Sequence, residues 1–205
     1  MDASNNVYVT GYSRHSHNLP DDNSDWATVK YTASGDEVWV KRYSGPDALD
    51  DEANAIAVSG SGNIYVTGFT CRRTTSRDYT TIAYGQDGTE LWLLEYDGPA
   101  NGVDEALAIA VDGLGNVYVT GSSFDEGTHR DFATIKYLQA LRGDMDGDQL
   151  IDIQDIAHLI TYLYQNGSAP QPLEAGNANC DELVDLTDVL HLINYVLKEG
   201  PPPDC

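Results

Sequence analysis

The last third of the chain is organised around twelve residues, Asp144-Met145-Asp146-Gly147-Asp148-Gln149-Leu150-Ile151-Asp152-Ile153-Gln154-Asp155. Acidic residues stand at loop positions 1, 3, 5, 9 and 12, which are Asp144, Asp146, Asp148, Asp152 and Asp155. Position 7 is Leu150, where a calcium-binding loop supplies a backbone carbonyl. Calcium takes about six to eight oxygen ligands, and a tight loop turns alternate side chains inward. The spacing therefore predicts a calcium site rather than a solvated acidic turn.

A second copy of this loop begins 33 residues later. Its residues at positions 1, 3, 5, 7, 9 and 12 are Asn177, Asn179, Asp181, Leu183, Asp185 and Asp188. Apolar residues spaced i, i+3, i+4, i+7 follow each loop and predict a helix with one buried face. These are Ile156, Leu159, Ile160 and Leu163 after the first loop, and Val189, Leu192, Ile193 and Val196 after the second. Each helix is expected to stop at a glycine, Gly167 or Gly200.

The duplicated EF-hand-type loop and helix resembles the type I dockerin domain over residues 143–205. The resemblance implies a small all-α domain that binds two calcium ions and docks onto a cohesin-type protein module or a cell-surface component. It also implies that loop positions 10 and 11 choose the partner; these are Ile153, Gln154, Leu186 and Thr187, which are more apolar than the usual hydroxyl pair. His158 and His191 hold equivalent helix positions, where packing or partner contact is expected rather than catalysis.

The two loops are not equal. Both depart from the usual glycine at position 6, where Gln149 and Glu182 stand. The second loop offers the neutral amides of Asn177 and Asn179 where the first offers carboxylates, so we expect the first site to bind calcium more tightly. Weak loops fill only where calcium is about millimolar, which predicts an extracellular or cell-surface location. Residues 1–6 lack the pattern of a signal peptide, so we expect either that a signal was removed or that the chain is part of a longer polypeptide.

The chain has only three cysteines, and no CxxC or Cys/His spacing suggests a zinc site. Cys180 lies inside the second loop and Cys205 is the last residue. A disulfide between them would tie the proline-rich tail to the loop in an oxidising compartment, and two free thiols are the equal alternative. Cys71 has no evident partner.

The first part of the chain is a repeat with a period of 53 residues. Asn63-Ile64-Tyr65-Val66-Thr67-Gly68 recurs at 116–121 and also occurs at 6–11, and the segment 25–31 returns at 78–84 and 131–137. The complete copy contains four β-type runs, at about 53–58, 63–69, 79–84 and 90–96. Four antiparallel strands per repeat are typical of a propeller blade. The repeats resemble the seven-bladed beta-propeller repeat family of bacterial secreted proteins over nearly all of residues 2–137.

Ten strands make about two and a half blades, because the first copy lacks its first strand and the third lacks its last. A closed propeller takes at least about four blades, so we expect exposed blade faces and a free sheet edge. The predicted fold is multidomain: an all-β partial propeller at 1–137, a short linker at 138–142 and the all-α domain at 143–205.

The net charge of −22 argues against binding nucleic acid or an anionic membrane surface. The chain has no apolar run of about 18 residues, so no membrane span is expected. Residues 143–205 hold 12 of the 33 acidic residues but one of the 11 basic residues, a density that calcium ligands explain.

Three other kinds of residue group have side chains that could form a functional site. His15 and His17 are expected in a polar surface loop. The repeated pairs Asp51-Glu52 and Asp104-Glu105 suggest turn and strand-end roles more than the paired carboxylates of a glycosidase. Arginines of the loops between the second and third strands form a basic spot that either meets an acidic ligand, such as a uronic acid, or balances local charge: Arg72, Arg73, Arg77 and Arg130.

These features favour an extracellular, non-catalytic binding and assembly protein. The rival hypothesis is a fragment of a secreted polysaccharide-degrading enzyme, a propeller hydrolase or lyase whose catalytic blades lie upstream. A third hypothesis gives the helical domain no partner and makes it a cap on the open stack of blades.

Overall fold

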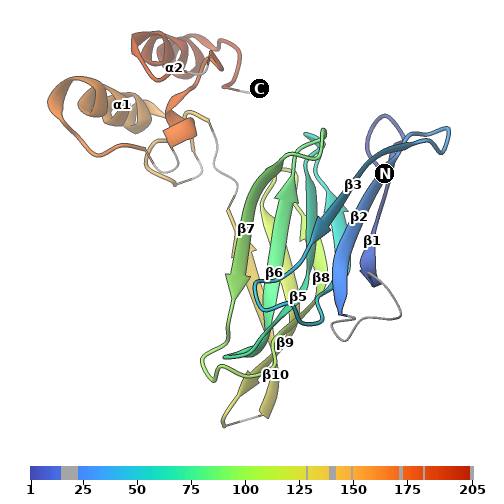
Figure 1. Cartoon of the computed structure of the whole chain (residues 1–205). Coiled ribbons are helices and arrows are strands. Elements are labelled where there is room, and N and C mark those ends of the chain that lie inside the picture. Colours follow the sequence, from blue (N-terminus) through green and yellow to red (C-terminus); the bar gives the residue numbers. More distant parts are fainter. Residues whose placement is uncertain are drawn as a thin grey trace. The chain divides into compact units, whose positions relative to one another are not determined.

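The computed structural model describes residues 1–14, 23–127, 129–138, 142–148, 150–170, 173–181 and 183–203 (Figure 1). The chain separates into two compact units, Met1–Leu138 and Gln139–Cys205. Each unit has its own core, and each is described by itself below.

The described part of the first unit forms three antiparallel sheets. The first sheet has the order β1 (Val7–Arg14), β2 (Ser24–Tyr31), β3 (Glu37–Tyr43). The second has the order β4 (Glu52–Val58), β5 (Ile64–Arg72), β6 (Ser76–Tyr84), β7 (Glu90–Tyr96). The third has the order β10 (His129–Tyr137), β9 (Val117–Asp125), β8 (Glu105–Val111). This confirms the predicted arrangement of one whole blade between two incomplete ones.

The four-stranded sheet is covered on both faces. Its β5 is buried from Ile64 to Thr70 and its β6 from Asp78 to Tyr84, which explains why apolar residues occupy consecutive positions there. Two clusters fill the layers: one includes Trp26, Ile64 and Ile82, and the other includes Tyr65, Tyr79 and Val119. Trp26 also donates its indole N–H to the carbonyl of Phe69, 3.1 Å away, so a hydrogen bond joins the first sheet to the second.

The two three-stranded sheets each leave apolar side chains in solvent. Val9, Tyr12 and Val38 are exposed on the first sheet, and Phe132 of β10 is 85% exposed. Within the described residues, β10 pairs only with β9. The expected exposed blade faces and free edge are therefore present. One detail differs: β5 and β6 extend beyond the predicted runs of 63–69 and 79–84, because the two strands stay paired as far as Arg72 opposite Ser76.

The second unit contains α1 (Ile153–Gln165), a 3-10 turn (Leu173–Gly176) and α2 (Leu186–Lys198). Asp152 and Asp185 cap the two helices at their N-termini, each in a capping box. The helices pack through the two predicted apolar stripes, whose most buried members are Ile156, Leu159, Val189 and Leu192.

The expectation that a glycine ends each helix needs a correction. The left-handed residues are Asn166 and Glu199, both with φ 54°, and the glycine comes one residue later. At Gly167 a Cβ would lie 2.7 Å from Cγ2 of Thr161, so that glycine is required by close approach rather than by its φ. Among the described helices, none is long and apolar enough to cross a membrane.

Candidate metal centre

The first loop brings three carboxylates together. Asp144, Asp146 and Asp148 each contribute one oxygen to a group whose atoms all lie within 4.8 Å of one another. Asp144 is buried, whereas the other two are exposed to solvent. Three like charges at this spacing repel one another, so a hard cation that accepts all three oxygens stabilises the loop.

Asp155 fastens the first loop to α1. Its side chain is buried, its Oδ1 accepts from the N–H of Met145 (2.6 Å) and its Oδ2 accepts from the N–H of Asp152 (2.7 Å). Burial raises the pKa of Asp155, and the charges of Asp146 and Asp144 add to that rise, while the two hydrogen bonds oppose it. Each carboxylate oxygen has a second lone pair, so these hydrogen bonds are compatible with a metal bond. Asp152, the cap of α1, accepts from the N–H of Gln154 (2.7 Å).

The described backbone turns through positive φ at loop position 4, with Gly147 at 80° and Cys180 at 67°. Sequence reasoning placed this demand at position 6, but Gln149 and Glu182 lie outside the described residues. In the first loop, the glycine at position 4, Gly147, was the sequence feature that could have predicted this positive φ. At position 7, the N–H groups of Leu150 and Leu183 donate to the carboxylates of Asp148 and Asp181, so the side chain at position 5 orders the turn in both loops.

The second loop keeps the same framework with fewer charges. Asp188 is buried and accepts from the N–H groups of Asn179 (3.0 Å) and Asp185 (2.8 Å), as Asp155 does in the first loop. Asn177 Oδ1 accepts from the N–H of Asp181 (3.1 Å). The side-chain amide of Asn179 donates to Asp181 (3.0 Å), whereas the equivalent residue of the first loop, Asp146, places a carboxylate next to that of Asp148.

The residues at loop positions 10 and 11 are the first two residues of each helix. Ile153 is 56% and Leu186 51% exposed, and Gln154 and Thr187 are also exposed. Thr187 donates its hydroxyl to Asp185 Oδ1 (2.7 Å). This arrangement leaves an apolar side chain in solvent directly beside each metal loop.

The two histidines proposed beside this surface are less accessible. His158 and His191 are half-buried, and His158 Nε2 lies 3.3 Å from the hydroxyl oxygen of Ser168. His191 Nε2 is buried and has no hydrogen-bond partner among the described residues. Their role in partner contact stays a prediction.

Two other sequence predictions fall on residues outside those described. The Cys180–Cys205 disulfide involves Cys205, and the surface-loop role concerns His15 and His17; both stay predictions. Cys71 is a free thiol whose pKa is raised by burial.

The repeated acidic pairs and the basic spot of the first unit have structural partners. Asp51 is fully buried and accepts from the N–H groups of Gly45 (2.5 Å) and Cys71 (2.9 Å). Asp104, one period later, accepts from those of Gly98 (2.8 Å) and Phe124 (3.0 Å). These contacts are those of turn and strand-end residues.

Ion pairs hold three of the four arginines of the basic spot. Arg72 pairs with Glu95, Arg77 pairs with Glu105, and Arg130 lies 3.6 Å from Glu105. The arrangement favours local charge balance over a ligand site.

Comparison with known proteins agrees with this architecture. No curated protein shows significant similarity to the chain. Residues 38–70 and 100–123 match the family described as Beta-propeller repeat, and residues 142–197 match the family described as Dockerin type I domain. Dockerin type I domains bind calcium and dock onto cohesin modules. The chain therefore carries beta-propeller repeats followed by a C-terminal type I dockerin domain.

Proposed function

We propose that this chain is an extracellular, non-catalytic binding and assembly protein. Its dockerin unit attaches it to a cohesin-type partner, and its blades present loops on a rigid scaffold. The observation that supports this most directly is the duplicated loop. Its first copy gathers three carboxylates within 4.8 Å, and each copy is followed by an exposed apolar residue that begins a helix. Dockerin domains occur in secreted or cell-surface proteins, where calcium is abundant.

Calcium acts here as a folding ligand at two sites. In the first loop the proposed ligands are Asp144, Asp146, Asp148, Asp152, Asp155 and the carbonyl of Leu150. In the second they are Asn177, Asn179, Asp181, Asp185, Asp188 and the carbonyl of Leu183. Position 12 of each loop already fixes two backbone N–H groups, so an ion bound there holds the loop and the start of the helix together.

The proposed docking surface consists of the first residues of the two helices. Ile153 and Leu186 are large apolar side chains, yet each is about half exposed. Exposed apolar surface of this kind is unfavourable in water and marks a surface for a partner. A cohesin face with apolar pockets would cover them. Because both side chains directly follow position 9 of a metal loop, ordering of the loop by calcium also orders the docking surface.

A pull-down of the full chain on immobilised cohesin modules, with calcium or with chelator, tests docking. We expect capture in calcium and release in chelator. Leu186→Asp and Ile153→Asp should each weaken capture at least about tenfold, because a charge replaces an apolar anchor. Leu197→Asp is the matched control, since Leu197 is 61% exposed on the last turn of α2. Capture that persists in chelator would contradict calcium-dependent docking.

The rival enzyme hypothesis has its own assay. The full chain is incubated with neutral and with uronic-acid-containing polysaccharides, and released reducing ends or unsaturated products are measured. We expect no release, because the repeated carboxylates of Asp51 and Asp104 are buried and bound to backbone N–H groups. Product release above a heat-treated control would refute the non-catalytic assignment.

A further inference from the structure

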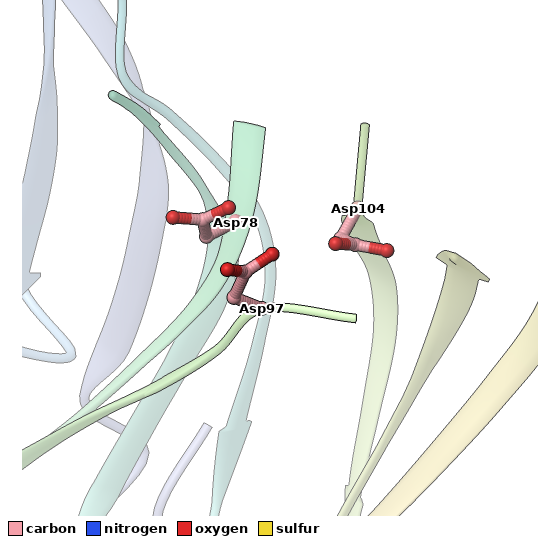
Figure 2. A group of neighbouring side chains, drawn as sticks. All are labelled: Asp78, Asp97 and Asp104. Carbon is pink, nitrogen blue, oxygen red and sulfur yellow. The ribbon is translucent and has the colours of Figure 1, made fainter. Parts of the chain in front are cut away.

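A second group of carboxylates lies in the blades, far along the sequence from the dockerin loops. Asp78, Asp97 and Asp104 each contribute one oxygen to a group whose atoms all lie within 4.8 Å of one another. Figure 2 shows the carboxyl groups of Asp78 and Asp97 next to each other, with that of Asp104 across a short space. Asp78 belongs to β6, Asp97 follows the last residue of β7, and Asp104 precedes β8. The group therefore lies where the second sheet passes into the third.

One oxygen of the buried Asp78 carboxylate is left unsatisfied by the described residues. The residue is only 3% exposed, and its Oδ1 has no hydrogen-bond partner among the described residues. Its Oδ2 accepts from the hydroxyl of Thr75 (2.5 Å) and lies 3.6 Å from Nε of Arg72. Arg72 is shared with Glu95, so it cannot neutralise the group by itself. A buried carboxylate oxygen without a partner is costly, and it points to a ligand that completes it.

Asp104 is held in a fixed orientation. It is fully buried, and each of its oxygens accepts one backbone N–H, from Phe124 and from Gly98. At Gly98 a Cβ would lie 2.8 Å from Asp104 Oδ1 and 2.5 Å from the hydroxyl oxygen of Ser123. Glycine at this turn therefore lets the chain pass close to the carboxylate. Such a preset orientation lowers the entropy that binding costs.

Asp97 opens the group to solvent. It is exposed, its carboxylate faces the two others, and among the described residues no hydrogen bond or ion pair holds that carboxylate. The pKa of Asp78 is raised mainly by burial and further by the charge of Asp97, and burial followed by the charge of Asp104 raises the pKa of Asp97. These directions describe a group that is under electrostatic strain and would be relieved by a positive ion.

We propose that Asp78, Asp97 and Asp104 bind a calcium ion that clamps the second and third sheets together. The ligand set contains only carboxylate oxygens, which suit a hard cation and disfavour the metals that seek nitrogen or sulfur. Solvent reaches the site at Asp97, so water molecules supply the remaining ligands. The ion would join β6 and the end of β7, in the second sheet, to the start of β8, in the third sheet.

The junction between the first and second sheets is an internal control for this site. One period earlier the equivalent residues are Asp25, Ser44 and Asp51, so the preceding junction repeats two of the carboxylates and replaces the third by a hydroxyl. Asp51 makes the same pair of backbone contacts as Asp104. The junctions thus share one framework and differ in the third member of the group, which is Asp97 in one and Ser44 in the other.

The test uses the full chain and three readouts. All three tryptophans lie within residues 1–138, so tryptophan fluorescence follows unfolding of the blades alone. At calcium about a hundredfold above the Kd, the midpoint of this transition should rise by roughly 5 to 10 °C in the wild type. Asp97→Ser, which copies residue 44, should abolish the rise and lower the calcium stoichiometry measured by calorimetry by one ion. The helical signal of the dockerin unit should respond to calcium as before.

Ser44→Asp is the reciprocal variant. Ser44 is exposed, so the substitution leaves the core intact, and it should add a second calcium-dependent rise in the blade midpoint. A wild-type midpoint that ignores calcium would overturn the site, and so would a full rise in Asp97→Ser. An unchanged response in Ser44→Asp would overturn the view that the third carboxylate decides binding.

Discussion

The two units of this chain reach a folded state by different means. The blades build layered cores from side chains on separate sheets, such as Tyr65 and Val119, and they pair their arginines with acids on other strands. In the described part of the dockerin unit, the buried hydrophobic cluster is small: Met145, Ile156, Leu159, Ala178, Val189 and Leu192. Around this small core it crowds 12 acidic residues against two basic residues, Arg142 and Lys198. The difference supports the proposal that the dockerin unit needs calcium to fold, whereas the blades fold around cores of their own.

Removal of calcium should give the largest difference between the two units, because it should unfold the dockerin unit and leave the blades folded. Two ions at about a hundredfold above their Kd supply about 5 kcal/mol, comparable to the whole stability of about 3 to 9 kcal/mol expected for some 60 residues. In EDTA the full chain should lose most of its helical circular dichroism, because both described α-helices lie in the dockerin unit. Tryptophan fluorescence at room temperature should stay native-like. Helicity that ignores EDTA would refute the dependence on calcium, and magnesium at equal ionic strength is the control.

Core truncations sharpen the same contrast. Ile82→Ala in the blades and Leu192→Ala in the dockerin unit each empty a fully buried site and should cost about 2 to 5 kcal/mol. Each should lower only the thermal transition of its own unit, read by tryptophan fluorescence for the first and by circular dichroism for the second. A shift of both transitions in either variant would show that the units are energetically coupled. Leu114→Ala, at a position 58% exposed, is the control for loss of side-chain volume.

The repeat and the loops made much of this molecule predictable. A period of 53 residues locates strands without any propensity scale, because Asp78–Tyr84 and Asp131–Tyr137 must adopt equivalent structures. The strand order follows, and so does the open stack of blades. The calcium loops are local in sequence, so spacing alone brings Asp144, Asp146 and Asp148 together.

Features that depend on contacts between distant segments were not predictable. The carboxylates of Asp78, Asp97 and Asp104 meet only because the chain between β7 and β8 crosses from one sheet to the next. Asp97 also breaks the repeat, since its counterpart is Ser44, so the period concealed it. The left-handed turn at Asn166 was missed for another reason: the neighbouring Gly167 carries the stronger signal but serves close packing.

Alkaline pH offers a perturbation specific to the blades. Burial raises the pKa of Tyr84 from 10.0 to about 12, because ionisation in the core is costly. The unfolded chain loses this proton first, so the stabilisation is complete below pH 10 and is lost as the pH rises from 10 to about 12. The loss amounts to about 3 kcal/mol at most. Urea unfolding followed by tryptophan fluorescence across this range should show it. Tyr84→Phe should flatten the decline, and an equally steep decline in that variant would exclude Tyr84 as its source.

The smallest expected effect is a change in the calcium affinity of each loop. Asn179→Asp gives the second loop a fourth carboxylate ligand, and Asp146→Asn removes one from the equivalent position of the first. Each exchange should change the affinity of its own site about fivefold, or about 1 kcal/mol, in opposite directions. Without calcium, Asn179→Asp should also destabilise its loop, because it replaces the hydrogen bond from the Asn179 amide to Asp181 with repulsion. Calorimetry on the full chain measures both sites, with Gln165→Glu as the charge control on an exposed helical position. Equal weakening by both exchanges would mean that loop geometry, rather than charge, makes the sites unequal.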